Sequence, residues 1–593
     1  MASRYIVGID LGTTNSALAF AEAGGSASQL LPIAQVVQPG QVEERPLLPS
    51  FLYLPRPGEV PTGTLRLPWA ADRDYAVGEY ARRQGSQVET RLVASAKSWL
   101  CHPGVDRKAA ILPFKAGEGD RRISPVEAST LYLRHLVEAW NAQLPSDPLT
   151  AQEIVLTVPA SFDAVARELT VEAARAAGLE HLTLLEEPQA AFYAWLGQQG
   201  DDWRERVRVG DVILVCDVGG GTSDLSLIAV EEEAGRMMLR RVAVGDHILL
   251  GGDNMDLTLA YFLAKKLGTK LDIGQMLMLR HAAREAKETL LNDPAKASAP
   301  ITVVGRGSKL IGGTLRTELT RDELTAQLLD GFFPEVGADA MPRAAHVAGF
   351  AEMGLPYASD PSITAHLAYF LRRHADDLSK YRDGPPQPTA VLFNGGVFKA
   401  EPFRQRVLGA LERWSAGHAE PVKVLPSADL DLAVAKGAAY YGQVRHGKGV
   451  RIRGGTSRSY YVGIETAQPA VPGVPPPLKA LCVVPFGMEE GTATDVPGHE
   501  SFLVINAPAE FRFLSSTVRQ NDVVGLLLED WDEHELEEMA PLSTTLVDPS
   551  GHTQYIPVRL HSNVTEIGTL ELWCQSRDGK QRWKLEFNVR DRR

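Results

Sequence analysis

The sequence predicts an α/β domain of two related lobes, followed by an all-β sandwich. The first observation is a repeat: residues 8–16 (GIDLGTTNS) and 216–224 (CDVGGGTSD) both combine an aspartate, a glycine turn and a threonine. Each segment follows an apolar run, which is typical of a buried strand entering a tight turn. The second observation is that alternating segments such as 510–514 and 569–573 replace helical periodicity after residue 459. Such alternation favours a β-sandwich.

The repeated glycine turns are suited to hold phosphate. Glycine lets the backbone approach a phosphate and turn its N–H groups toward it, and threonine hydroxyls add donors. Asp10 and Asp217 end the two strands, where a carboxylate can hold a hydrated magnesium ion. One such turn alone would be a hairpin or a helix cap, but the pair predicts a nucleotide held between two lobes. Neither turn has the sequence of a Walker loop or a Rossmann fingerprint.

Composition and charge argue against several classes of protein. A chain of 593 residues is too long for one hydrophobic core, so several domains are expected. The net charge of −13 argues against nucleic-acid binding by phosphate neutralisation. The four cysteines lack the spacing of a zinc or redox motif, and no signal core or membrane-spanning apolar stretch stands out. We therefore expect a cytoplasmic protein with no nucleic-acid or membrane partner.

Local signals divide the chain into domains. The polar segment 201–206 precedes the second apolar strand, and the stretch from 446 is glycine-rich and basic, as in a linker. The expected units are a first lobe over 1–207, a second lobe over 208–445, a linker over 446–458 and the β-sandwich over 459–593.

Several helices can also be placed from the pattern of caps and apolar residues. The segment 124–127 (SPVE) has the N-cap, proline and glutamate that begin a helix. Further helices are expected over 163–177 and 276–291, and an extra helix over 364–377 lies within a long stretch, 334–388, that has no assigned function.

Further segments carry a resemblance to a known family. They are, in chain order, 156–163 (LTVPASFD), 173–179 (AARAAGL), 185–191 (LEEPQAA), 249–256 (LLGGDNMD), 391–396 (VLFNGG) and 432–439 (LAVAKGAA). With the two glycine turns they resemble the actin-like ATPase superfamily and, within it, the DnaK-type 70-kDa heat-shock chaperones. The motifs occur in the family's order over roughly the first three quarters of the chain, which makes chance agreement improbable.

The resemblance implies a fold, an activity and partners. The fold would be an actin-like ATPase domain of two duplicated lobes, then a β-sandwich that binds an unfolded or extended polypeptide segment. No long helical tail precedes Arg593, so the family's C-terminal helical lid is expected to be absent. The implied cofactors are ATP/ADP and Mg²⁺, and the implied activity is slow ATP hydrolysis that regulates polypeptide binding. Whether a J-domain co-chaperone and a nucleotide-exchange factor take part stays open.

The resemblance also assigns roles to residues by their place in the motifs. Asp10, Asp217 and Asp224 would organise magnesium and its waters. Lys97, which taken alone would be a solvated helix charge, would neutralise charge on the terminal phosphate and orient the attacking water. The implied catalytic residues are Asp10, Lys97, Glu187, Asp217 and Thr222. Glu187 and Pro159 would also sense the nucleotide and relay its state outward, with Arg167 as the candidate partner. The implied nucleotide contacts are Gly12, Thr13, Thr14, Asn15, Gly219, Gly220, Gly221, Thr222, Gly251, Gly252, Lys287, Glu288, Gly395, Gly396, Lys399 and Asp431.

The sequence departs from the family pattern at three places. Glu288 stands where the family has an arginine that stacks on adenine, and a carboxylate cannot supply that planar cation. Lys399 is a candidate replacement for the family's second flanking arginine, and Phe398 is a candidate for an aromatic contact in its place. Arg451 and Arg453 make the linker basic, whereas the family's linker is acidic and leucine-rich. The third departure is the missing lid.

Two other functions stay open beside an ATP-dependent chaperone. One is a nucleotide-gated scaffold or regulatory protein that binds ATP with little hydrolysis and docks a dedicated partner, which Glu288 and the missing lid favour. The other is a small-molecule kinase of the same superfamily, against which the C-terminal β-domain argues.

Overall fold

The computed structural model describes residues 3–585 apart from short gaps. The residues left out within that range are 26–27, 86, 103, 304–313, 345–353, 382–386, 416–419, 428, 457, 466–476, 490, 499–500, 533, 540–541, 548–551 and 566–568. None of the helices in the described part is both long and apolar enough to cross a membrane.

The amino-terminal part is built on a mixed sheet with the strand order β11-β10-β1-β2-β3, and β6 pairs with β2. Its strands are β1 (Tyr5–Leu11), β2 (Asn15–Glu22), β3 (Gln29–Leu30), β6 (Leu48–Pro49), β10 (Glu153–Val158) and β11 (Leu182–Glu186). Val7 and Ile9 on one face of β1 pack with α3 (Pro125–Gln143) and α4 (Ala164–Ala176). Gly8 faces α14 (Ala433–Arg445), where a Cβ would lie 2.2 Å from the carbonyl oxygen of Ala435.

A second sheet repeats this arrangement, with the order β18-β17-β12-β13-β14-β19. Its strands are β12 (Val212–Val218), β13 (Ser223–Glu233), β14 (Arg236–Val244), β17 (Ala390–Asn394), β18 (Lys423–Leu425) and β19 (Ile452–Arg453). In both sheets the first strand pairs antiparallel with the next strand and parallel with a later one. The strands that carry Asp10 and Asp217 therefore hold equivalent places in their sheets.

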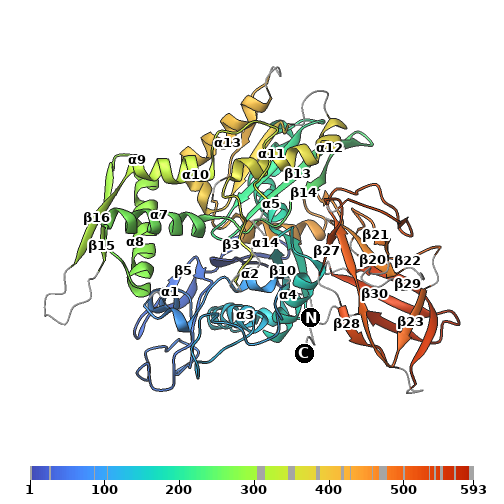
Figure 1. The fold of residues 1–593 in the computed structure, drawn as a ribbon, viewed down its shortest axis with the longest axis horizontal. Coiled ribbons are helices and arrows are strands. Elements are labelled where there is room, and N and C mark those ends of the chain that lie inside the picture. Colours follow the sequence, from blue (N-terminus) through green and yellow to red (C-terminus); the bar gives the residue numbers. More distant parts are fainter. Residues whose placement is uncertain are drawn as a thin grey trace.

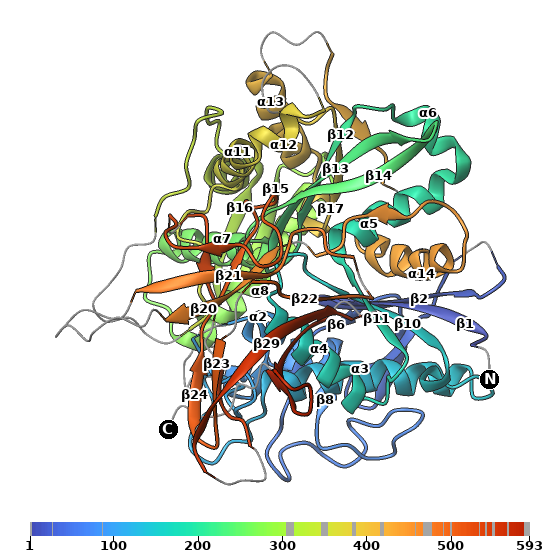
Figure 2. The same ribbon diagram turned by 90° about the vertical axis from the view of Figure 1, so that its right-hand side faces the viewer.

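Two helices fill the space between these sheets. α5 (Glu187–Gln199) and α14 pack with Ile213 and Val215 on one face of β12, and also with Val155 of β10. The other face of the second sheet packs with α7 (Gly252–Leu267), α11 (Ile363–Arg373) and α13 (Glu401–Trp414). Figure 2 shows α5 and α14 between the strands β12–β14 and the strands β1, β2 and β10. The ends of β1 and β12 are thereby held at fixed places on either side of the same pair of helices.

The helix starts follow local sequence signals. Ser124 Oγ accepts the backbone N–H of Glu127 at 3.0 Å, and Asp163 caps α4 by accepting from Ala166. The helix expected over 276–291 is α8 (Ile273–Asn292). The remaining helices are α1 (Glu79–Gly85), α2 (Ala96–Leu100), α6 (Trp203–Arg206), α9 (Arg321–Leu324), α10 (Asp330–Phe332) and α12 (Ala375–Ser379).

The prediction of one continuous helix over 364–377 is wrong, because two helices cover this range. α11 ends at Arg373 and α12 begins at Ala375. Between them His374 has φ −107° and ψ 24°, which is outside the helical region, and its Nδ1 lies 3.3 Å from Asp377 Oδ2. Parts of the stretch 334–388, at 345–353 and 382–386, lie outside the described residues.

The C-terminal described residues form antiparallel sheets. One has the order β26-β21-β20-β25-β27 and the other β22-β29-β30-β31 with β23 on β29. Inward side chains such as Leu481, Phe513, Leu560 and Leu572 from both sheets share one buried cluster. The strands are β20 (Ser459–Glu465), β21 (Leu478–Val484), β22 (Thr492–Asp495), β23 (Ser501–Ile505), β24 (Pro508–Phe511), β25 (Phe513–Ser516), β26 (Leu527–Leu528), β27 (Glu537–Glu538), β28 (Leu542–Thr545), β29 (Gln554–Val564), β30 (Leu570–Ser576) and β31 (Arg582–Leu585).

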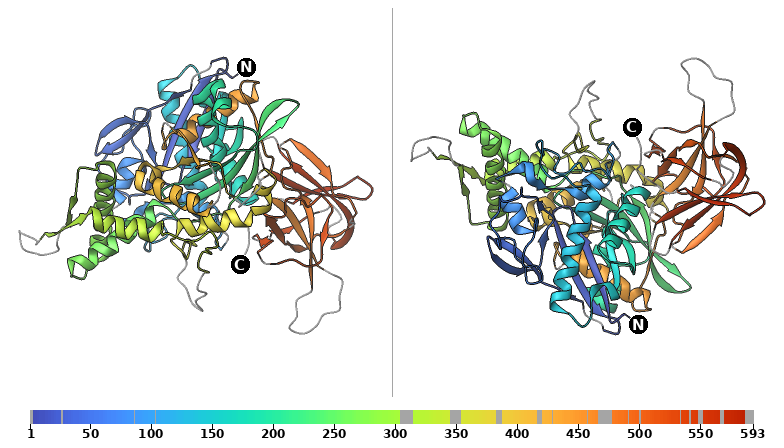
Figure 3. Two further views of the ribbon diagram at one scale, coloured as in Figure 1. Left: turned by 90° about the horizontal axis from the view of Figure 1, so that it is seen from above. Right: turned by 90° about the horizontal axis from the view of Figure 1, so that it is seen from below.

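Smaller elements complete the molecule. They are the strands β4 (Ile33–Gln38), β5 (Gln41–Arg45), β7 (Leu52–Tyr53), β8 (Ala76–Val77), β9 (Leu92–Val93), β15 (Ser298–Val303) and β16 (Leu315–Thr320). Figures 1 and 3 show β15–β16 at the opposite end of the molecule from the C-terminal sheets, with the two mixed sheets between them.

The connecting segment 446–458 lies against the second sheet. Within it, β19 adds to β14 in parallel, with Ile452 opposite Leu239 and Arg453 opposite Arg240. Arg453 also forms an ion pair with Glu233 at 2.9 Å. Arg453, one of the two basic residues of the predicted linker, thus contacts an acidic residue of the second sheet.

Candidate nucleotide site

Acidic side chains gather where the two mixed sheets face each other. Asp10 lies at the end of β1 and is half-buried, while Asp217 and Asp224 lie opposite each other on β12 and β13 and are buried. Glu187 begins α5, and its Oε1 forms an ion pair with Lys97 Nζ from α2. The sequence therefore brings together four carboxylates and one ammonium group from five different elements.

Each aspartate has a neutral hydrogen-bond partner, and for Asp10 it is Thr157, whose Oγ1 donates to Asp10 Oδ1 at 3.3 Å. Asn394 Nδ2 donates to Asp217 Oδ2 at 2.7 Å, and Ser161 Oγ donates to Asp224 Oδ1 at 2.8 Å. These hydrogen bonds fix how the carboxyl groups point. They leave four acidic groups beside one ammonium group.

Burial of this charge shifts the pKa of each acid upward. Desolvation raises the pKa of Asp10 to about 7, with Glu187 adding to the rise. Desolvation likewise raises the pKa of Asp217 to about 8, and it raises the pKa of Asp224 and of Glu187. Burial alone would lower the pKa of Lys97, but Glu187 and Asp10 offset it and the net shift is upward. A bound cation would favour the ionised carboxylates.

The donor set fits a hydrated magnesium ion. Among the described residues no three His, Cys, Asp or Glu side chains are close enough to form a direct metal-ligand group. Magnesium binds hard oxygen ligands and usually keeps several of its waters. Carboxylates at the ends of β1, β12 and β13 are therefore suited to hold those waters.

The glycine turns pack so closely that side chains are excluded from them. A Cβ on Gly220 would lie 2.0 Å from Thr14 Oγ1, and one on Gly251 would lie 2.6 Å from the carbonyl oxygen of Gly219. Within the described part of the chain, the buried Thr14 Oγ1 has no hydrogen-bond partner. A hydroxyl in this state beside bare backbone fits a phosphate oxygen, because a buried polar group without a partner costs free energy.

Other predicted loop residues lie along the same turns. A Cβ on Gly221 would lie 2.7 Å from Thr13 Cγ2, and one on Gly12 would lie 2.1 Å from the carbonyl oxygen of Asn15. Gly395 has φ +85°, and a Cβ there would lie 2.6 Å from Asp217 Oδ1. Thr222 donates a side-chain hydrogen bond to Asp224.

A cavity of about 450 Å³ opens beside these turns. Ten of the predicted nucleotide contacts line it: Thr14, Asn15, Gly219, Gly220, Gly252, Lys287, Glu288, Gly396, Lys399 and Asp431. Lys287 Nζ lies 2.6 Å from Asp256 Oδ1, and Lys399 forms an ion pair with Asp431. The cavity is thus rimmed by cations that are already paired within the protein.

The structure adds residues that the sequence reasoning missed. Arg284 lines the cavity one helical turn before Glu288, and its Nε donates to Glu288 Oε1 at 3.0 Å. The Arg284 guanidinium therefore lies beside Glu288, the position where the family resemblance led us to expect an arginine. The i,i+4 spacing of Arg284 and Glu288 on a predicted helix was the available signal. Arg45 and Arg82 also line the cavity, and no motif marks either residue.

Arg167 contacts a neighbour of the residue expected. Its Nη2 donates to Glu186 Oε1 at 2.8 Å and contacts the carbonyl oxygen of Ala160, whereas Glu187 pairs with Lys97. Glu186 ends β11 and Glu187 begins α5, so adjacent carboxylates point to different partners. Arg241 completes the Glu186 cluster and its Nη2 donates to the carbonyl oxygen of Gly455 at 2.5 Å.

A second path joins the acidic cluster to the C-terminal sheets. The carbonyl oxygen of Ser161 lies 3.5 Å from Arg458 Nη2, and Arg458 Nη1 lies 2.7 Å from Glu537 Oε2. Ser161 therefore contacts Asp224 through its side chain and the start of β20 through its backbone.

Comparison with known proteins shows the family of the chain. The family model described as "Hsp70 protein" matches residues 6–337, which is more than half of the chain. The chain is 32% identical over 304 residues to the protein named chaperone protein HscA of Serratia proteamaculans, covering 48% of this chain and 42% of that protein. It is 33% identical over 312 residues to an HscA homolog of Chromobacterium violaceum, covering 51% and 44%. It is 31% identical over 301 residues to one of Azotobacter vinelandii, covering 48% and 42%. The matched part thus spans less than half the length of these relatives.

Proposed function

Because this chain belongs to the Hsp70 family, we propose that it is an ATP-dependent molecular chaperone. In this proposal the segments 1–207 and 208–445 are the lobes of a nucleotide-binding domain, 446–458 is the linker, and 459–593 binds an unfolded or extended polypeptide in the cytoplasm. The observation that carries the proposal is that three aspartates, Glu187 and Lys97 gather beside the glycine turns where the two mixed sheets meet. Binding and slow hydrolysis of ATP with magnesium account for this combination of charges.

The protein's own groups can perform the steps of hydrolysis. The backbone N–H groups of Gly220 and Gly221, with Thr14 Oγ1, would donate to phosphate oxygens, whereas the N–H of Gly219 donates to the carbonyl oxygen of Thr222. Asp10, Asp217 and Asp224 would hold magnesium, which neutralises charge on the phosphates when bound. Lys97 would move from Glu187 toward the terminal phosphate, because a doubly charged oxyanion competes for its ammonium group. Glu187 would then be free to orient a water molecule for attack.

The base of the nucleotide would lie near α8. Arg284 and Glu288 line the same cavity as Lys287 and Lys399. We assign to Arg284 the stacking role that Glu288 cannot fill, with Glu288 holding the guanidinium in place through its hydrogen bond.

Communication with the polypeptide-binding part would use the linker contacts. β19 extends the second sheet, and Arg241 joins Glu186 to the backbone at Gly455. A nucleotide that shifts Glu187 would also act on the adjacent Glu186 and hence on the linker. From its family we propose a J-domain protein and a nucleotide-exchange factor as further partners.

The second candidate is a scaffold that binds ATP with little hydrolysis. The paired state of Lys97, with Glu187 as its direct partner, favours it, because hydrolysis requires the pair to separate. Replacing Lys97 decides between the two. If the protein is an ATPase, Lys97→Ala lowers steady-state ATP turnover by about 10²- to 10³-fold while calorimetry shows ATP still bound. Turnover that is negligible in the wild type and equal in Lys97→Ala, with tight ATP binding in both, supports the scaffold.

A further inference from the structure

A cysteine lies next to the helix that carries Lys97. Cys101 directly follows α2, four residues after Lys97. Cys101 as a residue is partly exposed, whereas Cys216, Cys482 and Cys574 are buried. Cys101 Sγ lies 3.3 Å from His247 Nε2 and 3.2 Å from the carbonyl oxygen of Ser98. An imidazole thus faces the least buried of the four cysteines.

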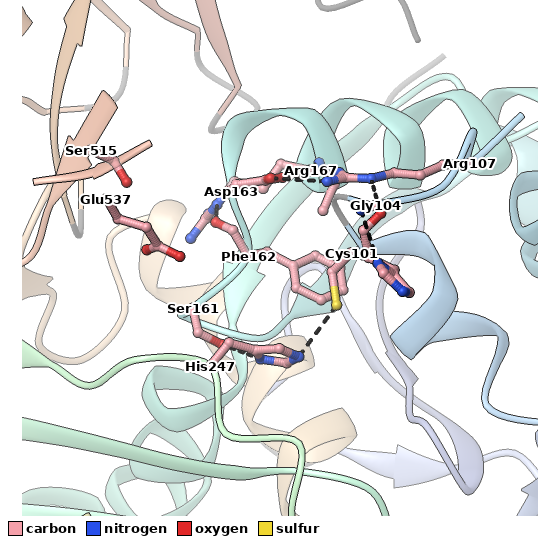
Figure 4. Close-up of polar contacts among 12 residues, drawn as sticks. Cys101, Gly104, Arg107, Ser161, Phe162, Asp163, Arg167, His247, Ser515 and Glu537 are labelled. Carbon is pink, nitrogen blue, oxygen red and sulfur yellow. Dashed lines mark hydrogen bonds and ion pairs between the residues drawn. The ribbon is translucent and has the colours of Figure 1, made fainter. Parts of the chain in front are cut away.

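The other ring nitrogen of His247 connects this thiol to the acidic cluster. His247 Nδ1 lies 2.7 Å from Ser161 Oγ, which in turn lies 2.8 Å from Asp224 Oδ1. The Ser161 hydroxyl donates its one hydrogen to the Asp224 carboxylate, so it can only accept from His247. Nδ1 of His247 must therefore carry the hydrogen of that contact. Nε2 of the neutral ring then presents a lone pair to the thiol. Figure 4 shows the imidazole between Ser161 and Cys101.

These contacts come from segments far apart in the chain. Cys101 belongs to the amino-terminal part, His247 follows β14 of the second sheet, and Asp224 lies on β13. Arg107 fixes the loop after Cys101, because its Nε donates to the carbonyl oxygen of His102 at 3.1 Å and its Nη2 lies 3.3 Å from Asp163 Oδ2. The thiol is therefore held across the junction of the two mixed sheets.

We propose that Cys101 is a redox-sensitive thiol whose oxidation by hydrogen peroxide, or alkylation by a small electrophile, impairs the magnesium-nucleotide site. The effect on nucleotide rests on the proposed function, whereas the selective reactivity of Cys101 does not.

The oxidation step balances with peroxide as the oxidant. The sulfur of Cys101 attacks one peroxide oxygen, the O–O bond breaks, and an S–O bond forms. The thiol proton passes to His247 Nε2 and then to the departing hydroxide, which leaves as water. The sulfur is oxidised to a sulfenic acid and the peroxide is reduced to water. A dithiol reductant reverses the step by forming a disulfide and releasing water.

The added atoms would disturb the groups on either side. The 3.3 Å between Sγ and Nε2 leaves no room for an oxygen between these two atoms, so an adduct on the side of the ring displaces the cysteine or the imidazole. His247 also lines a cavity of about 290 Å³ beside α11, together with Phe370 and Arg373, which gives the ring space to shift. Its movement would release Ser161 from its position on Asp224, and movement of Cys101 would displace the helix that carries Lys97.

The buried cysteines provide internal controls. Burial raises the pKa of Cys482 and of Cys574 to about 12 and raises that of Cys216 as well. Thiols in this state are protonated at neutral pH and react slowly.

Selective labelling tests the reactivity. The folded protein is treated with N-ethylmaleimide, and labelled cysteines are counted by mass spectrometry over time. We expect Cys101 to react about tenfold faster than the other three. His247→Gln should slow that reaction, while His366→Gln, which lines the same cavity and contacts the carbonyl oxygen of Asp360, should leave it unchanged. Equal rates at all four cysteines would overturn the inference. An unchanged rate at Cys101 in His247→Gln would overturn it as well.

The coupling is tested with peroxide and magnesium-ADP. Calorimetry should show weaker binding after peroxide, recovery with dithiothreitol, and no change in Cys101→Ser, which should keep wild-type ATP turnover. If Cys101 is modified and the affinity for magnesium-ADP does not fall, the inference is overturned while the proposed function stands. If the untreated protein binds no nucleotide, the proposed function and the coupling both fall.

Discussion

Arg284 Nε donates a hydrogen bond to Glu288 Oε1 at 3.0 Å, one turn further along α8. Both side chains line the cavity that also contains the glycine turns. The pair restores a planar cation to a place where the residue expected to supply it is a carboxylate. A single helical turn thus separates Arg284 from Glu288, the position where the family resemblance leads us to expect an arginine.

Replacing Arg284 should weaken adenine binding. Arg284→Ala removes the cation and planar face, so the dissociation constant for ATP should rise about tenfold, in line with the 1 to 2 kcal/mol of a desolvated cation–π contact. Calorimetry with ATP and GTP measures the effect. Arg280→Ala is the control, because Arg280 lies one turn earlier on α8, 4.0 Å from Asp253. Equal losses in the two variants would contradict the assignment.

An added methyl group in the phosphate turn should block binding. In Gly220→Ala the new Cβ would lie 2.0 Å from Thr14 Oγ1, so the two turns must move apart. We expect at least a tenfold loss of ATP affinity, equivalent to about 1.4 kcal/mol, with the fold kept. Gly331→Ala serves as a control, because a Cβ there meets nothing within 4 Å. Unchanged affinity in Gly220→Ala would remove this turn from the site.

Stability of the nucleotide-free protein should fall as pH rises through the neutral range. The pKa of Asp217 is raised from 3.8 to about 8 by desolvation, so the folded state keeps a proton that the unfolded chain loses. The stability from that proton is fully present below about pH 4 and is lost as pH rises through about 8. One such proton gives a slope of about 1.4 kcal/mol per pH unit between these values.

Urea unfolding from pH 5 to 8.5 measures this slope in the free energy of unfolding. Asp217→Asn should flatten it, because the amide does not titrate, and magnesium-ATP should flatten it in the wild type by favouring the ionised carboxylate. A slope that is the same in Asp217→Asn would assign the pH dependence to other groups, among them Asp10, whose pKa is raised to about 7.

The linker should loosen when Arg241 is replaced. Arg241 is 2% exposed and joins Glu186 to the backbone at Gly455. Arg241→Met leaves a buried carboxylate with one partner fewer, which should cost about 3 kcal/mol of stability and speed proteolysis within 446–458. Arg240→Ala is the control, since Arg240 is exposed and pairs with Glu231. Slow cleavage in both variants would show that Arg241 does not hold the linker.

The repeated motifs allowed much of the site to be predicted. Asp10 and Asp217 could be placed at strand ends because an apolar run followed by a glycine turn is typical of a buried strand that ends there. The structure shows their two strands at equivalent places in the two mixed sheets. Ser124 and Asp163 could be placed as helix caps because capping depends on neighbouring residues. The match of the family model to residues 6–337 confirms the family resemblance that these motifs carry.

Contacts between distant segments were beyond the same reasoning. Ser161 bonds to Asp224, and His247 meets Cys101, only because the two sheets pack around α5 and α14. β19 is two residues long, too short for a periodic pattern, and its place depends on the free edge of β14. His374 divides the expected helix through a contact with Asp377, which local propensity does not foresee.

The central claim is that a magnesium-dependent ATPase is coupled to a polypeptide-binding β-domain. The most direct test is steady-state ATP hydrolysis with magnesium, alone and across a library of extended peptides, beside ATP affinity by calorimetry. We predict slow basal turnover that some peptides raise in the wild type and fail to raise in Arg241→Met. Tight ATP binding without turnover, or turnover that no peptide changes, would contradict the account.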